Sequence, residues 1–423
     1  MLPRCERLKN GLRVVLVPCE AESVAVGVFV ASGSRHENRR VAGISHLIEH
    51  MLFKGTPTRR PLDITRAIEG RGGNFNACTS EEATIYYAHL PSDYLEEAVD
   101  ILADMYLHAS IPADEFVREK AVVLEEIKMY ADEPDSVALE NLQRNLFPRS
   151  TLGAPVAGSA QSLEPLRPVD LRRHLRAHYR PDNTVVVIAG SFDEASALAM
   201  VARSLGRHRA VKLRKFRPGE PLAGRVVARE EAAKDVQQAQ LALGYRTFGI
   251  ADSRKYAATV LDAILGRGMS SRLFQEVREK RGLSYDISSR WQFFADAGMF
   301  VISAGLDPAK APMALKTIDR ELKRVCERRV SAAELRRTKE FLLGNFRLAH
   351  EKVVSKMFFY GSTLLSFGRL VRPEEQIAGI QAVTAAEVQA VARAVFRPAN
   401  RSVSWVVPHG GKTDQQQKGV KTC

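Results

Sequence analysis

Apolar positions along the chain follow the spacing of strands in some stretches and that of amphipathic helices in others. Residues 12–31 (LRVVLVPCEAESVAVGVFVA) predict two β-strands, and TVVVIAG at residues 184–190 is a continuous apolar run typical of a buried strand. Helical spacing predicts four helices in the first half of the chain. The first begins near Ile44, and the other three cover Pro61–Glu69, Asp93–His108 and Ala113–Tyr130. Strands and helices therefore both contribute to the fold.

The same order of elements recurs about 210 residues further along the chain. VQQAQLALGYR (236–246) predicts a strand. SRKYAATVLDAILGRGMSSRLFQEVREK then predicts a helix, a glycine turn and another helix, and RGLSYDISSRWQFFADAGMFVISAGL predicts strands. We therefore predict an α+β fold of two structurally similar domains, each a mostly antiparallel sheet flanked by helices.

The repeat also places the domain boundaries. We expect an N-terminal domain over residues 1–208 and a C-terminal domain over residues 227–408. Residues 209–226 are basic and contain Pro and Gly, as expected of a linker. Residues 409–423 have few apolar side chains to anchor them and are predicted to be a disordered tail.

One short stretch of the first repeat carries titratable side chains in an otherwise apolar helix. In GISHLIEHMLFKGT (43–56), His46 and His50 are four residues apart and share one helix face, so both imidazoles can bind one Zn²⁺. Glu49 neighbours both rings and can contact a water on such a metal without binding the metal. This H-x-x-E-H spacing is the inverse of H-E-x-x-H and occurs in zinc peptidases.

A catalytic zinc site needs a third protein ligand and an open position for water. The best source is REKAVVLEEIK (118–128), in which Glu119 and Glu126 are seven residues apart and share a helix face, whereas Glu125 lies on another. We predict one zinc per chain, with Glu126 as the third ligand. Glu119 is predicted to support a histidine N–H or a ligand from behind.

The second repeat lacks this chemistry. When the two copies are overlaid, Thr259 and Ala263 take the positions of His46 and His50, and Asn345 lies opposite Glu126. The fold repeats and the histidine pair does not, which indicates that the histidines serve chemistry rather than architecture.

Charge and cysteine content narrow the function classes. The net charge is +13, but the basic residues are spread widely with no aromatic-interleaved run, so we expect no nucleic-acid partner. The apolar runs are too short to span a membrane, and we expect no membrane association. Five cysteines without a C-x-x-C pair favour a reducing compartment, and the N-terminus lacks a signal-peptide h-region. A cytoplasmic location is therefore predicted, unless a leader was removed.

Four motifs carry a resemblance to a known family, namely HLIEH, the glutamate 76 residues after His50, FKGT just after HLIEH, and GGNFNACTS. Through these motifs, nearly the whole chain resembles the pitrilysin/insulinase superfamily of zinc metallopeptidases. The nearest type is that of the bacterial enzymes similar to the mitochondrial processing peptidase. The resemblance implies that His46, His50 and Glu126 bind zinc and that Glu49 is the general base. It also implies that Glu119 supports the ligands.

The resemblance extends to substrate binding. Phe75, Asn76 and Ala77 match the edge strand along which family members align a peptide, and Arg278 and Tyr285 match a pair that binds substrate and steadies the tetrahedral intermediate. The activity implied is hydrolysis of short or unfolded peptides inside a closed chamber. Family chambers contain two domain pairs and this chain holds one, so a homodimer is expected, with a heterodimer of related subunits as the alternative.

Other functions remain open from the sequence. Some members of the superfamily are non-catalytic structural or assembly subunits, although those tend to have lost metal ligands that are present here. The chain could also be a basic binding protein in which HLIEH is incidental. The physiological metal, the substrate and the cleavage rule are not determined by the sequence.

Overall fold

The computed structural model describes residues 2–208 and 226–409. Apart from residues 226 and 409, the predicted linker (209–226) and tail (409–423) lie outside the described residues. Contacts between residues divide the chain into two compact units. No helix in the described ranges is long and apolar enough to cross a membrane.

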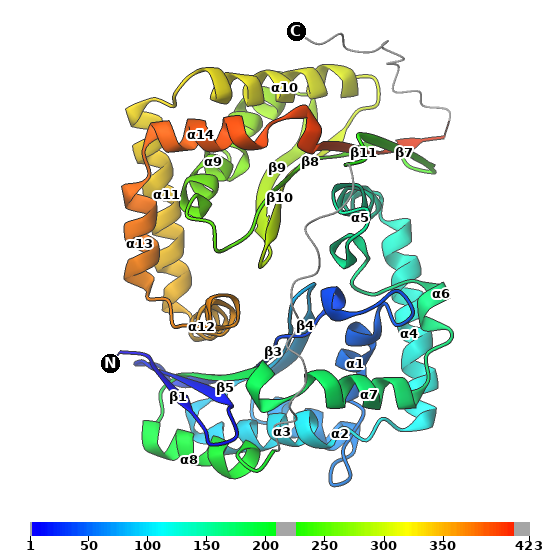
Figure 1. Ribbon diagram of the computed structural model, residues 1–423, viewed down its shortest axis with the longest axis vertical. Coiled ribbons are helices and arrows are strands. Elements are labelled where there is room, and N and C mark those ends of the chain that lie inside the picture. Colours follow the sequence, from blue (N-terminus) through cyan, green and yellow to red (C-terminus); the bar gives the residue numbers. More distant parts are fainter. Residues whose placement is uncertain (1, 209–225, 410–423) are drawn as a thin grey trace. The chain divides into compact units, whose positions relative to one another are not determined.

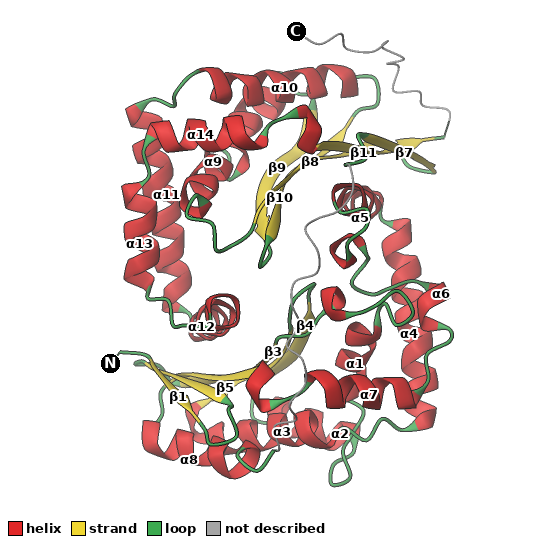
Figure 2. Ribbon diagram, viewed as in Figure 1, coloured by secondary structure: helices red, strands yellow, loops and turns green. Residues whose placement is uncertain are grey.

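The first unit is built on a six-stranded sheet in the order β1-β2-β6-β3-β5-β4. Figure 2 shows strands in yellow and the surrounding helices in red. β2 and β6 pair in parallel, and the other four pairs are antiparallel. The strands are β1 (Arg4–Arg7), β2 (Arg13–Pro18), β3 (Ser23–Val30), β4 (Asn74–Thr79), β5 (Thr84–Pro91) and β6 (Thr184–Gly190). The strand predicted at residues 184–190 is therefore confirmed.

The second unit repeats this sheet without the first strand. Its order is β7-β11-β8-β10-β9, with β7 and β11 parallel and the other three pairs antiparallel. The strands are β7 (Arg229–Lys234), β8 (Ala239–Phe248), β9 (Ser284–Phe293), β10 (Ala297–Leu306) and β11 (Arg401–Pro408). Order and direction match β2-β6-β3-β5-β4, which confirms the predicted α+β repeat.

Each sheet is buried on both faces, because alternate side chains of a strand enter different cores. In β2, Val14 and Leu16 belong to the core on the face that α1 and α3 cover, and Val15 and Val17 to the core on the opposite face. That opposite face is covered by α12 (Val353–Phe367), which comes from the second half of the chain (Figure 1). Conversely, α5 (Pro134–Leu146) packs on β8 and β11 of the second unit.

The compact units are therefore discontinuous in sequence. The first comprises the described residues of 1–128, 154–217 and 345–373, and the second those of 129–153, 218–344 and 374–423. This division does not follow the linear boundaries at residues 208 and 227, because each half of the chain gives one helix to the other unit. Those linear boundaries describe the two repeats along the chain and stay a prediction.

The remaining helices surround these sheets. In the first unit they are α1 (Ile44–Leu52), α2 (Pro61–Glu69), α3 (Leu95–His108), α6 (Ala160–Leu163), α7 (Pro168–His178) and α8 (Glu194–Leu205). In the second they are α9 (Lys255–Gly266), α10 (Ala311–Glu327) and α14 (Ala385–Val395). The residues of three further helices are divided between the two units, namely α4 (Ala113–Asp132), α11 (Ala332–Glu351) and α13 (Pro373–Ala382).

Three predicted helices differ in detail from the structure. The helix expected from Asp93 begins at Leu95, because Ser92–Tyr94 form a 3-10 turn. The helix expected to end at Tyr130 continues to Asp132, just before Pro134 opens the next one. The helix expected after the glycine turn of the second repeat contains a π-helical segment, Phe274–Glu279.

Three histidines lie together beside α1. The rings of His174 and His178, one turn apart on α7, stack at 4.2 Å between centroids, and His36 lies 6.1 Å from His178. His174 Nε2 is 3.2 Å from the hydroxyl of Ser32 and 3.4 Å from that of Ser45 on α1. Burial lowers the pKa of His36 to about 4, and it holds the pKa of His174 well below its ordinary value. The lowered pKa values of His36 and His174 therefore favour neutral imidazoles in this cluster.

This cluster predicts that the first unit loses stability in acid. The unfolded chain binds a proton at His36 near pH 6.5 and the folded chain only near pH 4, so stability falls as pH falls through that window. For His36 alone, the loss between pH 7 and pH 5 is about 2 kcal/mol. Urea unfolding of metal-free protein at both pH values checks this, with His36→Gln expected to reduce the loss. An equal loss in both proteins would contradict the prediction.

Candidate metal centre

Helix α1 has two chemically distinct faces. Five of its nine side chains are apolar and fully buried, namely Ile44, Leu47, Ile48, Met51 and Leu52. Their spacing leaves His46, Glu49 and His50 on the remaining face, partly exposed. Packing of the apolar stripe against the core of the first unit thereby fixes the direction in which the three polar side chains point.

The start of α1 is held by a carboxylate from outside the helix. The N-cap residue is Gly43, at φ +89°, where a Cβ would come within 2.4 Å of the carbonyl oxygen of Ala157. The backbone N–H groups of Gly43 and Ser45 each donate to the buried Glu37 carboxylate at 2.7 Å. Burial raises the pKa of Glu37 to about 7, and these donors oppose that shift. Glu37 thus satisfies two N–H groups that the helix leaves unpaired.

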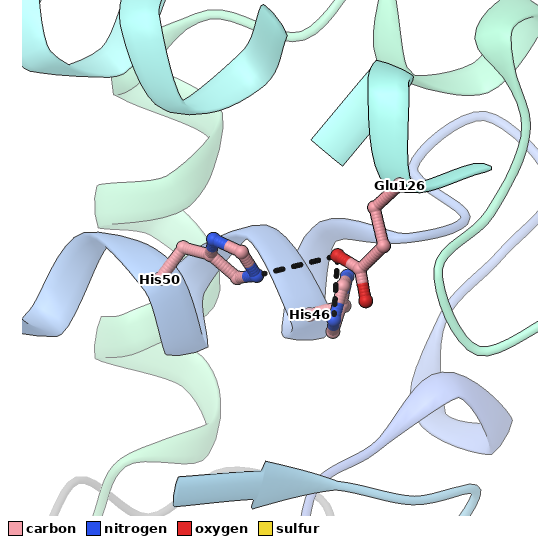
Figure 3. A group of neighbouring side chains, drawn as sticks. All are labelled: His46, His50 and Glu126. Carbon is pink, nitrogen blue, oxygen red and sulfur yellow. Dashed lines mark ion pairs between the residues drawn. The ribbon is translucent and has the colours of Figure 1, made fainter. Parts of the chain in front are cut away.

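Two imidazoles and one carboxylate converge at this face. Figure 3 shows His46 and His50 projecting from α1 toward Glu126 on α4. A single oxygen, Glu126 Oε2, lies 3.7 Å from His46 Nε2 and 3.6 Å from His50 Nε2. Within the described residues, this is the only set of three or more His, Cys, Asp or Glu side chains with ligand atoms all within 4.8 Å of one another.

These separations suit a metal ion better than direct hydrogen bonds. A nitrogen and an oxygen 3.6–3.7 Å apart are too distant for a hydrogen bond. Atoms bound to one tetrahedral zinc at about 2.0–2.1 Å lie about 3.3 Å from each other. Small side-chain movements would therefore bring all three donors onto one ion, and two histidines with one glutamate are a donor set found in catalytic zinc sites.

His50 is oriented by a carboxylate behind it. His50 Nδ1 lies 3.1 Å from Glu119 Oε2, so donation of that N–H leaves the lone pair of Nε2 facing Glu126. The other Glu119 oxygen is 2.7 Å from Lys54 Nζ, and Glu119 is only 8% exposed. Lys54 therefore compensates the charge of the buried Glu119 carboxylate, which also contacts the candidate ligand His50.

His46 is also suited to metal binding by its environment. Burial lowers its pKa, while the nearby Glu126 carboxylate acts in the opposite direction. A lowered pKa favours the neutral imidazole, which is the form that binds a metal. Its Nδ1 is buried without a hydrogen-bond partner among the described residues, so His46 lacks the support that His50 receives.

Glu49 has a different neighbour from the ligand candidates. Its Oε2 accepts a hydrogen bond of 2.5 Å from the hydroxyl of Thr79, the last residue of β4. No contact between Glu49 and Glu119 or Lys54 is seen within hydrogen-bond distance in the described part of the chain. The carboxylate beside the ring pair is thus held by a neutral donor.

The residues predicted to bind substrate lie on β4, at the edge of the sheet. Phe75 packs on the ring of Phe53 at 4.9 Å between centroids, and Ala77 lies against the same core. Asn76 is exposed, and its side-chain oxygen accepts a hydrogen bond from the N–H of Ala77. β4 pairs only with β5 among the described strands, so its other edge is open in the sense that no described strand pairs with it. Substrate binding there stays a prediction.

Arg278 and Tyr285 belong to the second unit. The Arg278 guanidinium carbon lies 5.6 Å from the centre of the Tyr285 ring and 4.6 Å from that of Phe274. Tyr285 is 80% exposed, so its hydroxyl is open to solvent. The structure brings the two predicted residues together within their unit, and their role toward the metal centre stays a prediction.

Sequence reasoning did not assign roles to Glu37, Lys54 or Thr79. Each is at least six residues from its partner along the chain and does not share a helix with it, so helix periodicity cannot reveal the contact. One signal existed for Glu37: α1 begins at a glycine and has no acidic residue in its first turn, which calls for a cap from elsewhere.

Fold and site together define a class of protein. Two related α+β repeats, with a His-His-Glu cluster and a neighbouring glutamate in the first alone among the described residues, are the arrangement expected of a zinc peptidase. Residues 13–160 match the family described as Insulinase (Peptidase family M16), and residues 166–342 match the Peptidase M16 inactive domain. The chain therefore belongs to the insulinase/pitrilysin family of peptidases, M16.

Relatives and solved structures agree with this assignment. An uncharacterized zinc protease of Mycobacterium tuberculosis is 38% identical over 99% of this chain and 96% of its own length. The uncharacterized zinc protease YmxG of Bacillus subtilis is 34% identical over 92% and 94%, respectively. The crystal structure of a protease from Helicobacter pylori has a TM-score of 0.92 at 22% identity, covering 96% of this chain and 99% of that one. The crystal structure of a peptidase M16 inactive domain from Pseudomonas fluorescens has a TM-score of 0.89 at 21% identity, covering 96% of this chain and 98% of that one.

The support of His50 by Glu119 predicts a measurable loss of metal affinity. Glu119→Gln removes the charge that holds the ring, so we expect zinc affinity to fall by about 10–100-fold. Competition with a chelator of known affinity measures this. Glu125→Gln is the matched control, since Glu125 lies on the same helix, is exposed and pairs only with Lys128 among the described residues. Equal affinities for the two variants would contradict the assigned role.

Proposed function

We propose that this chain is a zinc-dependent endopeptidase that hydrolyses short or unfolded peptides. One zinc ion per chain would be held by His46, His50 and Glu126. The observation that carries the proposal is the approach of both Nε2 atoms to one Glu126 oxygen, with the ring of His50 fixed from behind. Its membership in a peptidase family whose relatives are named zinc proteases supports the same conclusion.

Each residue of the site has a separate task in the proposed reaction. Bound zinc supplies Lewis-acid chemistry, which polarises a carbonyl and acidifies a water molecule. Glu49 takes the proton of the attacking water and passes it to the leaving amine. Tyr285 and Arg278 donate to the oxyanion and bind substrate, as in the family that the chain belongs to.

Peptide binding is proposed to occur by strand addition. An extended peptide would pair with the open edge of β4 along Phe75, Asn76 and Ala77 through main-chain hydrogen bonds. Such bonds read backbone shape more than side-chain identity, which suits a broad set of unfolded peptides. Folded proteins have few free extended segments to offer.

The first test separates metal binding from chemistry. We expect about one zinc ion per wild-type chain. The wild-type protein should hydrolyse a panel of unstructured peptides, and this hydrolysis should stop when a chelator is added. Glu49→Gln should keep its zinc and lose activity by about 10²–10⁴-fold, because a general base is missing. Glu126→Gln should lose both zinc and activity, and Glu125→Gln should lose neither.

One result would refute the proposed activity, and another would refute the role of Glu49. A protein without bound zinc that cleaves nothing would favour a non-catalytic subunit or a basic binding protein. Full activity of Glu49→Gln would show that another group removes the proton.

The chain is further proposed to act as a cytoplasmic homodimer without nucleic-acid or membrane partners. The chain holds one pair of repeats, and chambers of the family hold two such pairs. Light scattering of purified protein should therefore give about twice the chain mass of 46.9 kDa. A particle of one chain mass that cleaves peptides would contradict the dimer, and activity appearing only with a related subunit would indicate the heterodimer.

A further inference from the structure

Thr79 connects the open edge of the sheet to the glutamate beside the histidine pair. It is the last residue of β4, and its hydroxyl lies 2.5 Å from Glu49 Oε2 on α1. Among the described residues, this is the only hydrogen bond to the Glu49 side chain. The position of that carboxylate therefore depends on a strand rather than on its own helix.

The hydroxyl of Thr79 has one hydrogen and two candidate acceptors. Glu49 Oε2 is at 2.5 Å, whereas Thr84 Oγ1 is at 3.5 Å, the outer limit of a hydrogen bond. Thr84 in turn donates its own hydrogen to the carbonyl oxygen of Ser32 at 2.9 Å. The geometry therefore assigns the Thr79 hydrogen to the carboxylate, where a charged acceptor makes the stronger bond.

The strand that carries Thr79 is held firmly in place. Phe75, Ala77 and Thr79 alternate along β4 and share one face, and the first two pack against the core of the first unit. Thr79 is directly opposite Thr84 in the β4–β5 register. A one-residue shift of β4 would move all three side chains to the other face, so the hydroxyl position is set by the sheet.

We propose that Thr79 is a positioning residue for the general base and couples it to the peptide-docking edge. By holding Oε2, the hydroxyl leaves Oε1 of Glu49 to accept the proton of the attacking water. Because the same strand would pair with the peptide, Thr79 fixes the distance between the base and the bond to be cut. This inference rests on the proposed peptidase function.

Two variants of Thr79 distinguish the effect of its hydroxyl from the effect of its side-chain shape. Thr79→Val keeps the β-branched shape suited to a strand and removes the donor, whereas Thr79→Ser keeps the donor and removes the methyl group. Thr65→Val on α2 is the control, since its hydroxyl donates only to the Pro61 carbonyl oxygen within the described residues. Zinc content and melting temperature are measured for all variants.

Two readouts test the proposal. We expect Thr79→Val to lower kcat by about 10–100-fold with KM and zinc content close to wild type, and Thr79→Ser to retain activity within a few-fold. Crystal structures of the metal-free proteins should show one Glu49 conformer in wild type and Thr79→Ser, and a displaced or multiple Glu49 side chain in Thr79→Val. Thr65→Val should match wild type in both.

The outcomes are distinguishable. An unchanged Glu49 conformer in Thr79→Val, or a loss in Thr79→Ser as large as in Thr79→Val, would overturn the positioning role. A wild-type protein that cleaves no peptide would instead refute the peptidase function, and a Glu49 conformer that still depends on the Thr79 hydroxyl would support the positioning role by itself.

Discussion

The candidate site depends on the packing of one face of a nine-residue helix. Because the apolar stripe of α1 is buried, His46, Glu49 and His50 have only one direction in which to point. That direction leads to Glu126 on α4 and to the end of β4, so the same packing brings ring nitrogens, a carboxylate and a hydroxyl together. Glu37 completes this constraint by pairing with the N–H groups that start the helix.

Three carboxylates around α1 are held by three different kinds of partner. Glu37 accepts from backbone N–H groups, Glu119 contacts a lysine and a histidine, and Glu49 accepts from a neutral hydroxyl. Glu119 is thus held by a cation and by a candidate ligand, which fits its proposed role as a support. Glu49 is held by a single neutral hydroxyl among the described residues, which fits its proposed role as the general base.

The two repeats show how a fold can be kept while its chemistry is confined to one copy. Both sheets share strand order and direction, and both are covered on one face by a helix from the other half of the chain. The overlay of the two repeats in sequence places Thr259 and Ala263, on the mostly buried helix α9, opposite His46 and His50. Its apolar residues pack in the core of the second unit.

Much of this organisation follows from the sequence, because local periods encode it. Alternation and helical spacing predicted the strands, the main helices and the repeat, and the four- and seven-residue spacings placed His46 with His50 and Glu119 with Glu126 on common faces. The exchange of α5 and α12 and the contacts of Glu37, Lys54 and Thr79 came only from the tertiary structure. Those contacts join different elements or capping loops, and their distances are decided by how buried surfaces pack, which no local period records.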